Sequence, residues 1–349
     1  MLLLDKTIEE LLDLEEELIE AKENEKDNSL VELIRLYEEL FRKISADRKS
    51  EYTSSLDQIK KTLVAYLVRY GSYLKTQYQK DDHSAASTLK KAIMYQKELP
   101  LAYYRHGFLS YKQRDYLKAI THFQLAIDYQ EKCSQTVYLL NQQQLYNAQL
   151  YKSNSALYIA DTANAYLKEI ESEELSAKAP SYEQSPLFQL ISQNEAFLHA
   201  HAFTVVSAGE SRLCSKEECE NIIVENLLPD TFILYFSDGE HSLYFNRKNV
   251  RLSINHAEIL RFFFLHTTEQ SPATKYHFER IFSENQRGKG EIPTNTYIQN
   301  VRRIQKKIES LSGTHPVITN KRYQGQTGYY YNQTIPYTII HRSDHSFTL

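Results

Sequence analysis

A segment near the end of the chain, TNTYIQNVRRIQKKIES at residues 294–310, carries side chains that can form ion pairs and directed hydrogen bonds. Its apolar residues recur at the spacing of one buried helix face, and they are Ile298, Val301, Ile304 and Ile308. A helix buried on that face leaves outward a polar set that includes Thr296, Gln299, Asn300, Arg303 and Lys307. Taken alone, the segment is either a binding surface for an anionic partner or a solvated helix face.

The positive charge of this segment is local, because the whole chain carries a formal charge of -4 at pH 7. A protein that coats nucleic acid over its entire surface would be basic throughout, so the composition excludes that class but not a basic patch on one domain. With 349 residues, 42% of them hydrophobic and 25% charged, the chain has the composition of a folded protein of two or three domains.

The sequence favours a cytoplasmic protein without a membrane span. The opening MLLLDKTIEELL is too acidic and its apolar run too short for a signal peptide, and no later segment approaches the roughly 20 apolar residues of a membrane helix. Three cysteines, Cys133, Cys214 and Cys219, form neither a disulfide framework nor a zinc set and suit a reducing compartment. The spacing in CSKEEC is compatible with a redox pair, although a structural role is the simpler interpretation.

Motifs for catalysis are not found in the sequence. The glycines are too scattered for a phosphate-binding loop, and neither an H-E-x-x-H metal motif nor a nucleophile elbow is present. His199 and His201 are spaced i,i+2, which sends two imidazoles to different sides of a helix. We therefore expect a protein that is not an enzyme and needs no metal or cofactor.

The basic segment follows a long helical part, from residue 5 to about 175, in which apolar residues recur at helical spacing and proline is rare. TIEELLDLEEELIEA opens with Thr7 and Glu10 in capping-box positions, and SLVELIRLYEELFRKI repeats the design with Ser29 and Glu32. The inward face expected for the second helix consists of Leu33, Ile34, Tyr37, Leu40, Phe41 and Ile44. Two antiparallel helices are the simplest product. The proline- and serine-containing LSAKAPSYEQSP, residues 175–186, indicates a connection, and LFQLISQNEAFLHAHAFTVVS is expected to resume the helix.

Within the helical part, the segment 100–128 has the spacing of a helix-turn-helix repeat of about 34 residues. The residues at its packing positions are Tyr103, Gly107, Tyr116, Ala119, Phe123 and Ala126. The preceding segment echoes them through Gly71, Leu74, Ala85 and Ala92. These two segments resemble tetratricopeptide repeats, and a further helical pair, QQLYNAQLYKSN and SALYIADTANAYLKEI, follows. The resemblance implies a groove for a peptide or protein helix, whereas the alternative is an irregular bundle whose groove binds only its own chain.

After residue 230 the pattern becomes β-rich. TFILYF, SLYFN and NVRLS read as strands of a small antiparallel sheet, with a turn around Gly239 between the first two. Two helices, NHAEILRFFFLHT and TKYHFERIFSE, precede the basic helix. The first is expected to point Ile259, Leu260, Phe263 and Phe264 inward. PVITNKRYQGQTGYYYN then closes as two strands around a turn at Gln324 and Gly325.

This order of sheet, three helices and β-hairpin resembles the winged-helix DNA-binding domain of OmpR/PhoB-type bacterial response regulators, over residues 232–332. VRLSINHAEILRFFF matches the family's strand and first-helix start, with Ile254 and Asn255 in place of its leucine and threonine and Glu258 at its acid. IQNVRRIQKKIES matches the recognition helix, and VITNKRYQGQTGYYY matches the wing. The chain departs from the family at Ile298, where an acid is common, and at Gln305, which replaces a basic residue.

The resemblance implies that the basic helix enters the major groove of DNA, where amides pair with adenine and arginine with guanine. The expected base readers are Gln299, Asn300 and Arg303, the expected phosphate contacts are Arg302, Lys306 and Lys307, and Thr296 completes this surface.

The expected wing carries Lys321 and Arg322, which in this family would reach the minor groove or the DNA backbone. The loop NQRGKGEIPTN has two implied roles, contact with RNA polymerase or additional phosphate contacts through Arg287 and Lys289. Helical repeats stand where the family has its receiver domain, so phosphorylation of an aspartate is not the expected switch.

The predicted fold is therefore mainly α with a small α+β domain: a tetratricopeptide-like array at 1–175, a linker and connecting helix at 176–229, a winged helix at 230–332 and a tail at 333–349. The strand-like segment YTII in this tail would add an edge strand to the sheet or dock on the repeats. The leading hypothesis is a homodimeric bacterial transcription regulator that senses a peptide or protein and binds promoter DNA. The alternative is a scaffold protein that uses both domains for protein–protein interaction.

Overall fold

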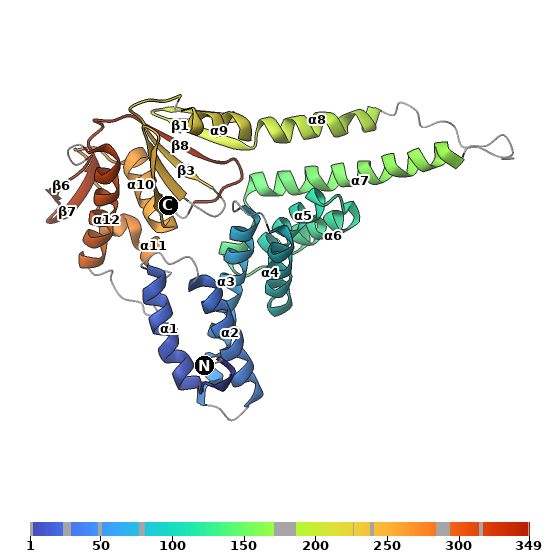
Figure 1. Ribbon diagram of the computed structural model, residues 1–349, viewed down its shortest axis with the longest axis horizontal. Coiled ribbons are helices and arrows are strands. Elements are labelled where there is room, and N and C mark those ends of the chain that lie inside the picture. Colours follow the sequence, from blue (N-terminus) through green and yellow to red (C-terminus); the bar gives the residue numbers. More distant parts are fainter. Residues whose placement is uncertain are drawn as a thin grey trace. The chain divides into compact units, whose positions relative to one another are not determined.

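The computed structural model describes residues 3–23, 29–47, 51–76, 81–170, 186–225, 227–237, 241–283, 294–313, 317–347 and 349 (Figure 1). The chain divides into two compact units, Met1–Asn194 and Glu195–Leu349. All described strands belong to the second unit. The structure thus confirms a mainly helical protein with a C-terminal sheet region.

The first unit is a succession of helices, each packed against the next. In addition, α3 packs against α5 and α5 against α7, so that alternate helices also touch. The elements are η1 (Leu3–Asp5), α1 (Ile8–Glu23), α2 (Ser29–Ala46), η2 (Glu51–Ser55), α3 (Leu56–Thr76), α4 (Asp82–Tyr95), α5 (Pro100–Lys112), α6 (Tyr116–Asp128), η3 (Thr136–Tyr138) and α7 (Gln142–Ile170).

The beginning of α1 follows the predicted capping box. The Thr7 N–H donates to the Glu10 carboxylate at 2.7 Å, and the Glu10 N–H donates to Thr7 Oγ1 at 3.2 Å. The predicted apolar face of α2 is also confirmed, since its residues are buried apart from the half-buried Phe41; they are Leu33, Ile34, Tyr37, Leu40 and Ile44.

The predicted repeat residues pack as small and large partners between paired helices. Ala85, Ala92, Ala119, Phe123 and Ala126 are fully buried, Tyr103 is buried, and Tyr116 is half-buried. Both glycines stand where a neighbouring helix crosses closest. A Cβ on Gly71 would lie 2.8 Å from Leu89 of α4, and one on Gly107 would lie 2.8 Å from the Phe123 ring of α6. Leu74 belongs to α3, but its side chain is outside the described part of the structure.

One helical prediction is wrong: the expected pair of helices after residue 141 is the single helix α7. The polar Asn154 and Ser155, which stand at the expected break, are completely buried within it. Their polar groups are satisfied there, because Asn154 donates to the Tyr111 hydroxyl and accepts from Asn194, while Ser155 Oγ donates to the Tyr151 carbonyl. Tertiary hydrogen bonds therefore remove the reason for a break.

The second unit contains a six-stranded sheet in the order β2-β1-β8-β3-β4-β5 and a separate two-stranded sheet, β6-β7. All neighbouring pairs are antiparallel except β3 and β8, which are parallel. Helix α8 (Pro186–Ala200) contains the boundary between the two units. The elements after it are β1 (Phe203–Ser207), β2 (Glu210–Cys214), α9 (Lys216–Val224), β3 (Phe232–Phe236), β4 (His241–Phe245), β5 (Lys248–Leu252), α10 (Ile254–His266), η4 (Lys275–Phe278), α11 (Glu279–Ser283), α12 (Thr294–Ser312), β6 (Ile318–Tyr323), β7 (Gln326–Tyr331) and β8 (Tyr337–Arg342).

The sheet is larger than the sequence predicted. The helix expected to run through residue 207 ends at Ala200, and Phe203–Ser207 forms β1, whose Phe203 and Val205 alternate inward. The C-terminal YTII segment forms β8, which lies between β1 and β3 in the middle of the sheet and not at its edge. The compact unit consequently begins at Glu195, before the expected start at residue 230.

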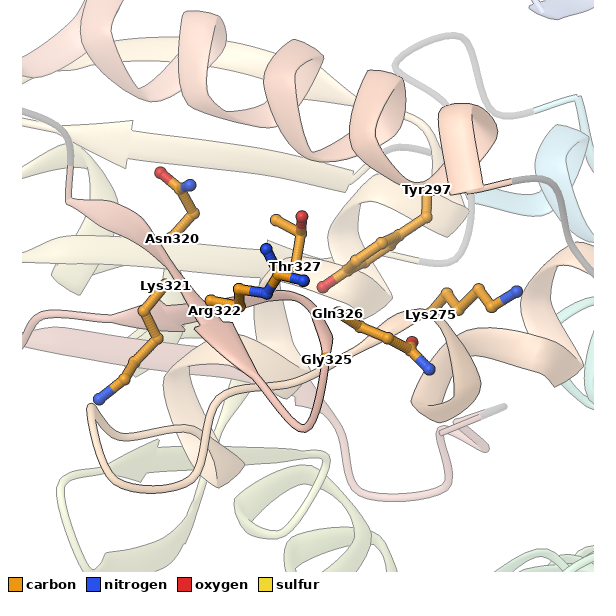
Figure 2. Close-up of a pocket in the computed structure, with 8 residues that line it drawn as sticks. All are labelled: Lys275, Tyr297, Asn320, Lys321, Arg322, Gly325, Gln326 and Thr327. Atoms are coloured by element: carbon orange, nitrogen blue, oxygen red, sulfur yellow. The ribbon is translucent and has the colours of Figure 1, made fainter.

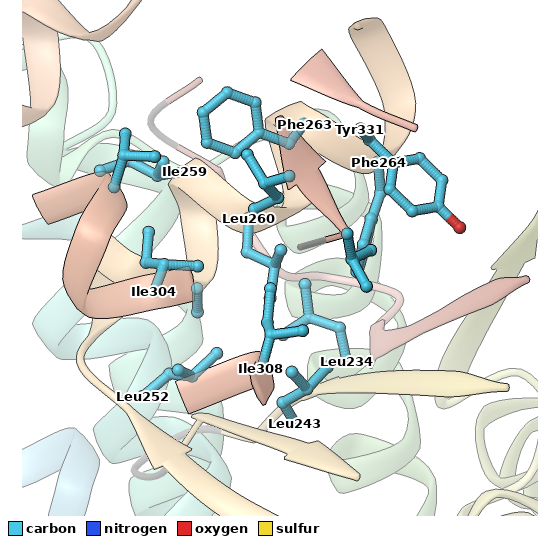
Figure 3. Close-up of a cluster of buried hydrophobic side chains, with 14 of the residues drawn as sticks. Leu234, Leu243, Leu252, Ile259, Leu260, Phe263, Phe264, Ile304, Ile308 and Tyr331 are labelled. Carbon is cyan, nitrogen blue, oxygen red and sulfur yellow. The ribbon is translucent and has the colours of Figure 1, made fainter. Parts of the chain in front are cut away.

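The two faces of this sheet bury different clusters. On one face, strand residues such as Leu234 and Leu243 meet α10 and α12, with side chains from all three layers interlocking (Figure 3). On the other face, the α9 residues Cys219 and Ile222 cover Phe203. The predicted inward residues of α10 are confirmed as buried: Ile259, Leu260, Phe263 and Phe264. This core holds α12 against the sheet, while the side of α12 that faces away from the sheet remains exposed.

Two histidines meet between α5 and α6. The Nδ1 atom of His106 lies 2.8 Å from the Nδ1 atom of His122, and Ser110 Oγ lies 3.2 Å from His122 Nδ1. Burial, followed by the neighbouring His106, lowers the pKa of His122 to about 4, and burial also lowers the pKa of His106. Both rings are therefore neutral at neutral pH.

The histidine pair predicts a loss of stability in acid. Unfolded His122 binds a proton near pH 6.5, whereas the folded residue does so only near pH 4, so stability should be complete above the upper value and decrease as pH falls through this window. Urea unfolding followed by circular dichroism at several pH values would measure this. His122→Gln should flatten the decline, and an unchanged slope would contradict the assignment.

The close approach of α5 and α6 predicts the effect of Gly107→Ala. The new methyl group would overlap the Phe123 ring, and overpacking of this kind costs about 1–3 kcal/mol, partly offset by the better helix propensity of alanine, worth about 1 kcal/mol. Thermal unfolding should show a lower midpoint. The matched control is Phe123→Leu in the same background: if the contact is responsible, Gly107→Ala should cost less when the ring is absent.

Candidate functional site

An exposed stripe of long polar side chains runs along α12. Gln299, Arg302, Arg303 and Lys306 are all exposed, and their i, i+3, i+4, i+7 spacing places them on one helix face. The opposite face is the buried one, formed by Tyr297, Val301, Ile304, Ile308 and Leu311. The exposed stripe therefore carries three cations and one amide, free of the core.

Tyr297 fixes the rotation of α12 about its axis. Its ring is almost completely buried, and its hydroxyl donates to the Ala273 carbonyl at 2.8 Å. Ala273 is in turn bonded to Tyr329 of β7 through both backbone groups, at 2.8 and 2.9 Å. Burial raises the pKa of Tyr297, so the hydroxyl keeps its proton and remains a donor. Ile298 was predicted to lie on the buried face of α12, but it is only half-buried at the edge of the core.

Two residues that the sequence placed outward instead face the body of the unit. Asn300 is half-buried: its Oδ1 accepts from His256 Nε2 of α10 at 3.0 Å, and its Nδ2 donates to the Thr296 carbonyl at 2.8 Å. Lys307 is also half-buried and donates to the Arg251 carbonyl of β5 at 2.9 Å. Both side chains join α12 to neighbouring elements, and Thr296 lies half-buried at the start of the helix.

The β6-β7 hairpin stands beside α12 (Figure 1). Gln324 and Gly325 form its turn with φ of 49° and 80°, as the sequence predicted for this position. Lys321 donates to the Glu269 carbonyl at 2.9 Å and lies 3.9 Å from the Glu269 carboxylate, whereas Arg322 is exposed. The hairpin thus adds one tethered cation and one exposed cation.

A hollow of about 430 Å³ lies between this hairpin, η4 and the first turn of α12. Figure 2 shows its lining side chains, with Lys275 and Lys321 on opposite sides of the group. The lining residues are Lys275, Tyr297, Asn320, Lys321, Arg322, Gly325, Gln326 and Thr327, among which the described structure places three cations and no carboxylate. Such a lining suits an anion, and α12 contributes Tyr297 to it.

Lys275 is the cation of this group that was not predicted from the sequence. It is a single lysine in the segment TKYHFERIF, which has no cluster of lysines or arginines to mark it. Only the fold brings η4 to the hairpin, where Gln326 Nε2 donates to the Tyr276 hydroxyl at 3.3 Å. Arg287 and Lys289, the other expected contacts, lie outside the described residues.

The cysteine and histidine candidates have structural surroundings. Cys214 and Cys219 are free thiols, both buried, and burial raises the pKa of each, which keeps them protonated and weakly nucleophilic. His199 is exposed, and His201 Nδ1 lies 2.8 Å from the Phe197 carbonyl. Across the described residues, no three His, Cys, Asp or Glu side chains gather as a metal site would require.

Comparison with known proteins finds no matching family model, no similar curated protein and no similar solved structure. Within the described part of the chain, no helix combines the length and the apolar character that a membrane crossing requires. Functional inference therefore rests on the geometry of the exposed stripe and the hollow.

The position of Asn300 predicts a structural role that differs from that of its exposed neighbour Gln299. Asn300→Ala would remove the hydrogen bond to the buried His256 of α10 and should lower the free energy of unfolding by about 1 kcal/mol. Gln299→Ala should change it by less than about 0.5 kcal/mol. Chemical unfolding of both variants measures the difference, and a double-mutant cycle with His256→Ala should show coupling for Asn300 only.

Proposed function

We propose that the second unit is a DNA-binding domain of the OmpR/PhoB winged-helix type, in which α12 is the recognition helix and the β6-β7 hairpin is the wing. The observation that carries the proposal is the exposed stripe of Gln299, Arg302, Arg303 and Lys306 on α12. A hollow with a basic lining, at the hairpin and the first turn of the same helix, supports it. An α-helix with a cationic face matches the dimensions of the major groove, and the adjacent hairpin supplies further cations.

The exposure of each side chain supports a division of roles. Gln299 and Arg303 are exposed and can present an amide and a guanidinium to base edges. Arg302 and Lys306 can neutralise phosphates along the groove, with Lys275 and Arg322 doing so from the hollow. Asn300 and Lys307, proposed from sequence as DNA contacts, are better assigned to holding α12 in place.

The first unit is proposed to receive the signal, as a tetratricopeptide-like array that binds a peptide or a protein. Its support is the recurrent glycine packing of Gly71 and Gly107 and a ladder of half-buried tyrosines on α5, α6 and α7. Tyr116 and Tyr158 stack at 4.5 Å with nearly parallel rings, and Tyr111 contacts both Tyr116 and Tyr151 edge-on. Tyrosines that expose part of the ring suit protein recognition. The whole chain is then a transcription regulator.

If α12 binds DNA, the double variant Arg302→Gln, Arg303→Gln should bind duplex DNA more weakly, and its binding should also depend less on salt concentration. The probe is a duplex pool of randomised sequence, with anisotropy measured over a range of salt concentrations. Each lost phosphate contact reduces the slope of log K against log salt by about 0.9, and loss of a base contact costs about 1–3 kcal/mol on a selected sequence.

The matched control is Lys90→Gln with Lys97→Gln, which removes the same charge from exposed positions of the first unit. This control should bind nearly as the unaltered protein does. Duplex binding that is absent, or whose salt slope is the same in all three proteins, would overturn the DNA assignment and favour a scaffold that binds only proteins.

A further inference from the structure

The six-stranded sheet has two edges, β2 and β5, and they differ in how far they are protected. In β2, Glu210, Ser211, Arg212 and Leu213 are all exposed, and only Cys214 is buried. An edge strand presents unpaired backbone N–H and C=O groups, which makes it a template for another strand unless charge, shape or a covering element prevents this.

Hairpin geometry shows which backbone groups of β2 point outward. The β1-β2 turn leaves Ser207 opposite Glu210, and in a two-residue hairpin this flanking pair is the hydrogen-bonded one. Backbone groups of Glu210 and Arg212 therefore face β1, while those of Ser211 and Leu213 face away from the sheet. The β4-β5 hairpin obeys the same rule, because Phe245 lies opposite Lys248 and the outward Arg251 carbonyl is the one that accepts from Lys307.

The β5 edge is guarded by these features. Lys307 occupies the outward carbonyl of Arg251, and the side chains of Lys248 and Arg251 repel a second copy of the same strand. On β2 the charges are of opposite sign, with Glu210 and Arg212 two residues apart and hence on the same face of the sheet. This pattern is self-complementary, which the charges on β5 are not.

We propose that two copies of the chain associate by antiparallel pairing of their β2 strands about Ser211. In this register Ser211 faces Ser211 of the second copy, and Gly209 faces Leu213, so the outward backbone groups of both strands bond to each other. Glu210 of each copy then lies opposite Arg212 of the other, giving two symmetric ion pairs. Pairing about Arg212 has the same backbone parity but sets Arg212 against itself, so charge selects the first register.

The β2 interface is isologous, as expected for a two-fold dimer, and it joins the two sheets into one continuous sheet. Arg212 already pairs with Glu218 of α9, so each arginine would lie between two carboxylates. Leu213, half-exposed on the other face of the strand, gains cover from the second copy. The proposal does not depend on DNA binding, because none of these residues belongs to α12 or to the hollow.

The test is sedimentation of the full chain over a range of concentrations, without DNA. Glu210→Arg sets two like charges opposite each other twice and should raise the dissociation constant of the dimer about tenfold or more. Arg212→Glu should also raise the dissociation constant, because it sets two negative charges opposite each other in place of two positive ones. An equimolar mixture of the two variants should regain dimers, since each arginine of one variant then meets a glutamate of the other.

A backbone variant provides a second, independent readout. Ser211→Pro removes the outward N–H, which an edge strand tolerates, and should abolish dimers, whereas Ser211→Ala keeps that N–H and should leave them intact. Circular dichroism and thermal unfolding verify that each variant is folded. A monomer at every concentration, or a dimer that neither Glu210→Arg nor Ser211→Pro weakens, would overturn the proposal.

Discussion

Burial of the Tyr297 ring is the constraint on which the arrangement of the second unit's polar surface depends. The ring fills the space between α12 and β7, and its hydroxyl has a fixed acceptor in the Ala273 carbonyl, which also holds Tyr329. An α-helix has one rotational setting that satisfies such a contact, so the stripe opposite Tyr297 is determined at the same time. Exposure of Arg302 and Lys306 is thus a consequence of where the tyrosine goes.

The sheet behind α12 is assembled from segments that are far apart in the chain. β8 follows β7 after a short connection and then enters the sheet between β1 and β3. Its Ile339 packs into the cluster with α10 and α12, whereas its neighbour Ile340 packs under α9. One strand therefore contributes to both cores, and the hairpin that emerges just before it is anchored to the centre of the unit.

The parts of the fold that sequence predicts well are those with local determinants. The α2 face, the capping box at Thr7 and the turn at Gln324 each depend on residues within one or two helical turns. Of the three strands predicted after residue 230, β3 and β4 contain short runs of large apolar and aromatic residues that are typical of strands, whereas β5 has only Val250 and Leu252 of this kind.

The sequence-based errors arise where distant residues decide. The apolar AFTVVS run continues a helical pattern, but it becomes a strand through pairing with β2 and with β8, which lies more than a hundred residues later in the chain. Asn300 looks like an outward amide until His256 is placed against it. Tyr297 is ambiguous in a helical pattern, because its ring favours burial while its hydroxyl needs a partner that the pattern does not contain. Lys275 carries no local signal, since its relevance comes only from the position of η4.

The distribution of charge within the second unit gives its basic surface a direction. The cations of α12 lie on one side of the sheet, while α9, on the other side, carries the exposed Glu217, Glu218 and Glu220. The field at a protein surface depends on where the charges lie and not on the net charge alone. Because the sheet keeps the two signs apart, a chain that is acidic overall presents a basic surface on one side of its second unit.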